Sequence, residues 1–202
     1  AGMTGLILNI HDAGGGNRLA LSATGDVSLS GGVTTAAQAG RLLNPFGGQP
    51  AENVLVQGQA AVDKGLSLGA KSQRERDYLD AVAALYTHDR APWHERVLRY
   101  EKAMEQLAQH YPQDREASIF YALALNVASD PTDKTFAKQL KAAAILEPIF
   151  AAQPDHPGAA HYLIHSYDYP PIAAKGLPAA RRYADIAPAA AHALHMPSHI
   201  FT

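Results

Sequence analysis

The chain has 202 residues, of which 47% are hydrophobic, and a formal net charge of -2 at pH 7. This length and composition suffice for one or two domains with a buried core. The near-balanced charge gives no electrostatic case for binding nucleic acid or an anionic membrane. No apolar run in the sequence approaches the roughly 18 residues that a membrane-spanning helix needs. Cysteine is absent, which excludes disulfides, thiolate metal sites and cysteine nucleophiles but leaves the cellular compartment open.

Residues 1–48 form a glycine-rich arm that differs in composition from the rest of the chain. Its residues 6–10 are a short apolar run, and residues 19–29 alternate loosely around Gly25-Asp26. Glycine-rich turns at 14–16 and 31–32 interrupt these stretches and break helices. The pattern favours a small β-hairpin or an irregular arm rather than a sheet with its own core.

Residues 49–202 show helical periodicity and are rich in alanine. Ser72, with Glu75 three residues later, has the spacing of a capping box, and Pro92 is placed to open a helix. Pro197 should kink the last helix or delay its start. The expected helices are 51–68, 72–85, 92–112, 114–127, 135–152, 157–167, 178–186 and 191 to the end. Short Pro, Gly and Asp turns join them, which predicts an all-α solenoid of antiparallel helix pairs.

Two stretches near the C-terminus repeat each other at one fixed spacing. The matching residues are Pro154 with Pro188, His161 with His195, and His165 with His199. This period, about 34 residues, is typical of the tetratricopeptide helix–turn–helix repeat. Residues 112–202 resemble that family position by position, with a short insertion before Pro154, and residues 50–202 resemble it in architecture. The resemblance implies that Leu163 and Tyr183 are buried between the two helices of a unit.

Four short motifs also resemble a particular family of bacterial repeat proteins. They are NPFGG at 44–48, HPGAAH at 156–161, IHSYD at 164–168 and HALHMPSH at 192–199. This resemblance implies no reaction, because we can assign no activity to that family. It implies a further helix pair before residue 44, where this chain carries its glycine-rich arm. The abrupt ends of the chain likewise favour a fragment of a longer protein, truncated at its C-terminus.

The opening residues of the chain, AGMTGLIL, resemble the closing strand of a cupredoxin domain from a multicopper oxidase. In that family a methionine near this strand is a copper ligand. The cysteine and histidine partners of such a site are missing from the arm, so Met3 cannot form it alone. We therefore expect the arm to be a remnant of an adjoining domain.

Histidine is concentrated at the C-terminal end, where six of the ten histidines fall within residues 156–202. Two pairs are spaced four residues apart, which places both rings of a pair on one helix face. The tetratricopeptide resemblance implies that these positions line a concave groove, where neighbouring first helices pack roughly 10 Å apart. The candidate ligands are His161, His165, His192, His195 and His199, with Asp168 and His156 as further ligands or as hydrogen-bond partners of the ligands.

Imidazole is the commonest metal-binding side chain, and a helix offers it to a metal at a spacing of four residues. Three or four nitrogens without thiolates suit zinc, copper, iron or nickel, and the sequence does not choose among them. If the site were catalytic, the metal would activate water or oxygen, with Asp168 as base or orienting group.

Two other interpretations stay open. The chain could be a non-catalytic scaffold whose groove binds a peptide or protein partner, or the histidines could simply pack in a hydrogen-bonded seam. The metal hypothesis makes a geometric prediction that the others do not. The imidazoles of His161 and His165 should face those of His195 and His199 across adjacent first helices. Side-chain nitrogens from both units should come within about 5 Å, because ligand bonds are near 2.0–2.1 Å.

Overall fold

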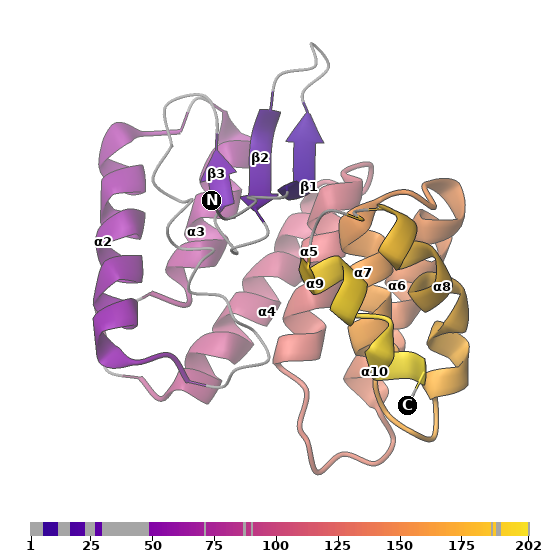
Figure 1. Cartoon of the computed structure of the whole chain (residues 1–202). Helices are drawn as coiled ribbons and strands as arrows, with labels where there is room; N and C mark the ends of the chain where they lie inside the picture. Colours follow the sequence, from indigo (N-terminus) through magenta and orange to yellow (C-terminus); the bar gives the residue numbers. More distant parts are fainter. Residues whose placement is uncertain are drawn as a thin grey trace. The chain divides into compact units, whose positions relative to one another are not determined.

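The computed structural model describes residues 6–11, 17–22, 27–29, 49–70, 72–86, 88–89, 91–186, 188 and 191–201. Its elements are labelled along the chain in Figure 1. The chain divides into two units, one containing Leu6–His110 and the other Tyr111–Thr202. The boundary lies between two helices, inside the region 49–202 that the sequence suggested as one helical domain.

The N-terminal strands pair through their backbones. β1 (Leu6–His11), β2 (Asn17–Ser22) and β3 (Val27–Leu29) form an antiparallel sheet in the order β1-β2-β3. The pairing of β1 with β2 is irregular at both ends, whereas β2 and β3 pair in a regular register. The expected hairpin is thus extended by a third strand. Met3 and the motif at 44–48 lie outside the described residues.

Three helices follow within the first unit: α2 (Glu52–Leu68), α3 (Gln73–Ala83) and α4 (Trp93–His110). Each packs against the next. α2 is followed by Gly69, whose φ of 71° lies in the region that only glycine enters without strain. The Ser72 side chain accepts a hydrogen bond from the backbone N–H of Glu75 at 3.2 Å, which confirms the predicted cap of α3.

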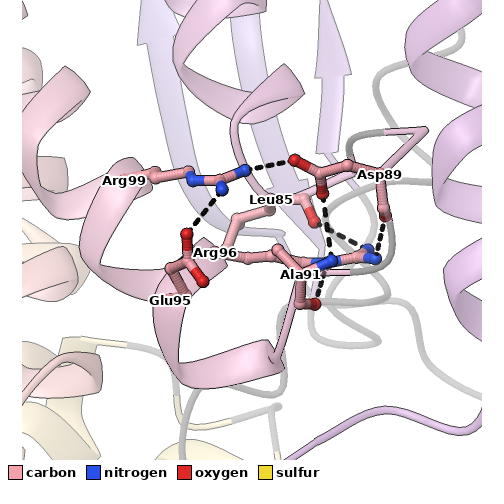
Figure 2. Close-up of polar contacts among 6 residues, drawn as sticks. All are labelled: Leu85, Asp89, Ala91, Glu95, Arg96 and Arg99. Carbon is pink, nitrogen blue, oxygen red and sulfur yellow. Dashed lines mark hydrogen bonds and ion pairs between the residues drawn. The ribbon is translucent and has the colours of Figure 1, made fainter.

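Two arginines of α4 fix the corner between α3 and α4 (Figure 2). Arg96 donates hydrogen bonds to the carbonyls of Ala91 at 2.9 Å and Asp89 at 2.6 Å, and reaches that of Leu85 at 3.5 Å. Arg99 joins the Asp89 carboxylate to Glu95, with both distances at 2.6 Å. These bonds satisfy backbone carbonyls in the segment that joins the two helices.

The second unit contains only helices and turns among its described residues. They are α5 (Arg115–Val127), α6 (Ala137–Ala152), α7 (Pro157–Tyr167), the 3-10 helix η1 (Ala173–Gly176), α8 (Leu177–Ile186), α9 (Ala191–His195) and α10 (Ser198–Phe201). Consecutive helices pack from α5 to α9, α5 also packs against α7, and α10 packs against α7 and α8. Leu163 and Tyr183 are buried, as the repeat pattern predicted.

Two prolines behave differently in this unit. Pro148 lies inside α6, which continues through it to Ala152. Pro197 instead interrupts the last expected helix, so that α9 ends at His195 and α10 begins at Ser198. The predicted interruption at Pro197 is confirmed. Within the described part of the chain, no helix combines the length and hydropathy that crossing a membrane demands.

Candidate functional site

The first histidine pair lies on α7. The helix opens at Pro157, a residue suited to the first turn because it has no N–H to leave unpaired. One turn apart, His161 and His165 bring their Nε2 atoms to 3.1 Å. Because one nitrogen of such a pair must donate and the other accept, two neutral imidazoles satisfy the contact.

A buried polar network holds α7 against α5. Asn126 of α5 donates to the Ser166 hydroxyl at 2.9 Å, and this hydroxyl donates to the Tyr162 carbonyl at 2.7 Å. Asn126 is 5% exposed and Ser166 is 0% exposed. Buried groups of this kind are costly unless paired, so the network specifies how α7 sits beside α5. Ser166 follows His165 directly, and the network therefore also fixes the position of the histidine pair.

The second group of histidines comes from α9 and α10. His192 and His195 lie on α9 and His199 lies on α10. His195 and His199 bring their Nε2 atoms to 3.1 Å. Between them, Met196 is fully buried, and Ile200 follows at 7% exposed. These two apolar side chains hold the short helices in place, because α9 has little hydrogen-bonded length of its own.

The two groups meet across α7 and α9. Nε2 of His192 lies 3.1 Å from Nε2 of His161, and the rings of His165 and His199 are 5.8 Å apart between centroids. The expected approach of nitrogens from the two repeat units is therefore present. The partner of His161 is His192 rather than His195, although both lie on α9.

The five imidazoles form a closed circuit, which we call the histidine ring. It consists of His192, His161, His165, His199 and His195, in that order. Successive ring centroids are separated by 4.9, 4.8, 5.8, 4.9 and 6.3 Å, ending back at His192. All five candidate ligands from the sequence thus lie together.

Asp168 contacts the histidine ring through His199. Its Oδ2 atom is 2.7 Å from Nδ1 of His199, and both side chains are about one-third exposed, at 35% and 31%. With Nδ1 as the donor, Nε2 of His199 carries the lone pair and faces His195. Of the two roles that the sequence allowed for Asp168, the geometry favours orienting a ligand over being one.

His161 is the most enclosed imidazole of the ring, at 8% exposed. It stacks on Tyr162 and on Tyr183, with ring centroids 5.3 Å from each and interplanar angles of 27° and 20°. Its Nδ1 atom is buried without a hydrogen-bond partner. The two tyrosine rings, rather than a hydrogen bond to Nδ1, therefore hold this imidazole.

Burial and mutual repulsion keep three of these histidines neutral. Burial lowers the pKa of His161 well below its usual value, and neighbouring His165, His192 and His199 lower it further. The same two causes lower the pKa of His165 to about 3. Partial burial, followed by His195 and His199, lowers the pKa of His192. At neutral pH each of these rings has one nitrogen lone pair, as a metal ligand requires.

Three pairs of Nε2 atoms in the ring lie within hydrogen-bonding distance of each other. Among the described residues, no group of three or more His, Asp or Glu side chains is arranged as a complete ligand set for an ion. The separations are nonetheless close to those of a metal site. Two ligand nitrogens on a tetrahedral ion with bonds of 2.0–2.1 Å lie about 3.3 Å apart. The 3.1 Å pairs would need only small side-chain rotations to reach that value.

His156, which the sequence suggested as a further ligand or a hydrogen-bond partner of the ligands, lies at the start of α7. Its Nδ1 accepts a hydrogen bond from the backbone N–H of Ala159 at 3.2 Å, capping α7, and its Nε2 lies 2.8 Å from Glu116 of α5. Both ring nitrogens are thus engaged at the start of the helix. His156 positions α7 and does not join the histidine ring.

A separate hollow lies in the first unit. It has a volume of about 530 Å³ and is lined by residues of α2, the loop after α3 and the start of α4. The lining includes Gln59, whose Oε1 atom is buried without a hydrogen-bond partner, and the exposed His88. None of the residues of the histidine ring contributes to it.

Sequence comparisons provide no independent assignment for this arrangement. No protein-family pattern, curated protein sequence or solved structure matches the chain. The geometry of the histidine ring is therefore the basis for the functional argument.

Proposed function

We propose that this chain is a helical-repeat protein of the tetratricopeptide type whose histidine ring binds a transition metal. The observation that carries the proposal is the meeting of three Nε2 atoms from two helices. His161 lies 3.1 Å from both His165 and His192. Hydrogen bonding alone explains this arrangement poorly, because Nε2 of His161 has either one proton or one lone pair for two neighbours.

A cation resolves that conflict. Neutral imidazoles that point their Nε2 lone pairs at one another repel, whereas a metal ion accepts all of them at once. The lowered pKa values of His161, His165 and His192 favour this interpretation, because protonation does not compete with the metal at neutral pH. All-nitrogen coordination suits zinc, copper, iron or nickel.

Three features support the repeat architecture. The repeat period relates the histidine pairs of α7 and α9–α10. In the second unit α5 packs against both α6 and α7, as the first helix of a repeat would pack against its partner and its successor. Leu163 and Tyr183 are buried, as residues at the packing positions of such a repeat would be.

A metal at this site would act as a Lewis acid and lower the pKa of a bound water. The protein's own contribution is positional. Tyr162 and Tyr183 clamp His161, and the Asn126–Ser166 network fixes α7. Asp168 lies 2.7 Å from Nδ1 of His199 and orients that ring. None of these contacts identifies a substrate.

Metal analysis of untagged protein tests the proposal. We expect tightly bound metal in the wild-type chain, and a lower metal content in a His161→Ala/His192→Ala variant, which lacks two of the three Nε2 atoms that meet. The matched control, His88→Ala/His94→Ala, removes two histidines of the first unit and should keep the wild-type metal content. Circular dichroism verifies that each variant is folded.

A metal-free wild-type protein that takes up no zinc, copper, iron or nickel on dialysis would contradict the proposal. Tight binding of a peptide by that metal-free protein would support the alternative, a scaffold with a partner in its groove. A rise in melting temperature on adding the metal to wild-type protein gives a second readout that depends on no substitution.

A further inference from the structure

The edges of the histidine ring are unequal. The separations from His161 to His165 and His192, and between His195 and His199, are 4.8, 4.9 and 4.9 Å. The remaining two edges, from His165 to His199 and from His192 to His195, are 5.8 and 6.3 Å. Two imidazoles bound through Nε2 to one tetrahedral ion have centroids about 5 Å apart. The short edges match this value and the long edges exceed it.

The nitrogen contacts divide the ring in the same way. Nε2 of His161 contacts those of His165 and His192, and Nε2 of His195 contacts that of His199, each at 3.1 Å. The ring therefore consists of a set of three imidazoles and a set of two. The long edges separate the two sets.

The two sets also differ in their surroundings. The set of three contains the buried His161, which is 8% exposed and stacks on two tyrosine rings, together with the partly exposed His165 and the exposed His192. In the set of two, His195 is exposed and the His199 side chain is 31% exposed. The Asp168 carboxylate contacts Nδ1 of His199, the arrangement by which carboxylates orient metal-binding histidines. An ion on the set of two would face solvent.

We propose that the histidine ring holds two transition-metal ions rather than one. The inner ion binds His161, His165 and His192, and the outer ion binds His195 and His199. Two nitrogen ligands leave at least two positions of a tetrahedral outer ion free for water or for an oxygen ligand of a substrate. Ions in paired sites lie about 3.5–4 Å apart, so one bridging oxygen could contact both. This inference rests on the proposed metal-binding function.

Zinc stoichiometry of the whole chain tests the division. Protein stripped with a chelator, reloaded with zinc and desalted should retain about two equivalents, given two separate ligand sets. A His195→Ala/His199→Ala variant should retain about one, because the set of three is intact. The His88→Ala/His94→Ala control should retain the wild-type value. His195 is exposed, and His199 lies on the short helix α10, so this variant is expected to stay folded.

The outcomes separate the two proposals. One equivalent in the wild-type protein, unchanged in the His195→Ala/His199→Ala variant, would overturn the two-ion arrangement and leave the metal-binding function intact. No retained zinc in any protein would overturn both. Loss of all zinc in the His195→Ala/His199→Ala variant would show a single shared ion instead of two.

Cobalt supplies a readout for the open positions. In protein loaded with cobalt(II), inorganic phosphate should alter the visible absorption spectrum of the wild type, because it can replace water on the outer ion. The His195→Ala/His199→Ala variant should retain a cobalt spectrum that phosphate does not change. An equal phosphate response in both proteins would contradict the assignment of the open positions to the outer ion.

Discussion

The two halves of the histidine ring share a sequence pattern but rest on different supports. α7 is a continuous helix that packs against α5, α6, α8, η1 and α10, and a buried polar network ties it to α5. The matching segment one repeat later is divided by Pro197 into α9 and α10. Met196 and Ile200 are its buried side chains near the break.

The comparison shows that two copies of a sequence repeat can place their histidines alike although their helices are not equally well supported by packing. Both segments place their histidines on the same side of the second unit, within contact of each other. The supporting contacts, however, make α7 part of the core and leave α9 and α10 as a thin outer layer. We therefore expect substitutions in α7 to affect the whole unit, and substitutions in α9–α10 to act locally.

The largest expected difference comes from matched core truncations. Ile164 of α7 and Met196 after α9 are both 0% exposed. Ile164→Ala should lower the free energy of unfolding by about 2–5 kcal/mol, since it removes buried methyl groups and leaves a cavity. Met196→Ala should lower it less, and should instead increase hydrogen exchange in residues 191–201. Urea denaturation measures the first effect. Equal losses in global stability would contradict the comparison.

Acid should destabilise the part of the histidine ring that lies on α7 in metal-free protein. Burial lowers the folded-state pKa of His165 to about 3, below the usual value of 6.5. The unfolded chain therefore binds more protons between these values, and stability falls as the pH drops from about 6.5 toward 3. For His165 alone, the loss between pH 7 and pH 4.5 is about 2.5 kcal/mol.

Urea denaturation at several pH values between 7 and 4.5 measures this loss. A His165→Asn variant should show a weaker dependence of unfolding free energy on pH than the wild type. His88→Asn, which removes an exposed histidine of the first unit, is the control and should keep the wild-type dependence. A pH dependence unchanged by His165→Asn would show that this residue is not buried in its neutral form.

Gly176 connects the two halves and offers a smaller, directed perturbation. A Cβ at this position would lie 2.7 Å from Cδ1 of Ile200 and 3.1 Å from Cβ of Tyr167. Gly176→Ala should therefore cost about 1–3 kcal/mol and push α10 away from α7. Because His199 adjoins Ile200, zinc binding at the outer ligands should weaken while the inner ion stays. Gly69→Ala provides a contrast without steric overlap: its Cβ would meet no atom within 4 Å, and the only cost comes from the φ of 71°.

Much of the helical arrangement was predictable because local signals are strong. The Ser72 cap, the turn at Gly69 and the interruption at Pro197 each follow from the chemistry of a single residue. The prediction of 135–152 as one helix agrees with α6 (Ala137–Ala152), which continues through Pro148 although proline usually ends helices. The 3-10 helix η1 was missed, since Ala173–Gly176 has no distinctive pattern.

The residues of the candidate site were predictable, but their partners were not. The helical spacing within each pair and the repeat period between pairs pointed to the histidines of the ring. Nothing in that spacing indicated that His161 would contact His192, because the repeat period pairs His161 with His195 instead. The network between Asn126 and Ser166 was also missed, since the two residues are 40 positions apart. His156 shared the histidine signal yet caps α7 and contacts Glu116.

The smallest expected effect concerns Asp168 and separates charge from geometry. Asp168→Asn keeps an oxygen that can accept the hydrogen bond from Nδ1 of His199, but it removes the negative charge. Both partners are about one-third exposed, so the free energy of unfolding should change by less than about 1 kcal/mol. Zinc affinity at the outer ligands should nevertheless fall about tenfold, because the carboxylate makes the imidazole a stronger ligand.

Asp155→Asn, which removes a carboxylate paired with Arg182 on the same unit, is the matched control and should leave zinc affinity unchanged. Competition with a zinc-binding dye measures the affinity of each ion. Unchanged affinity in Asp168→Asn would limit Asp168 to a structural contact, whereas weakening of both ions would mean that the outer half of the ring supports the inner half.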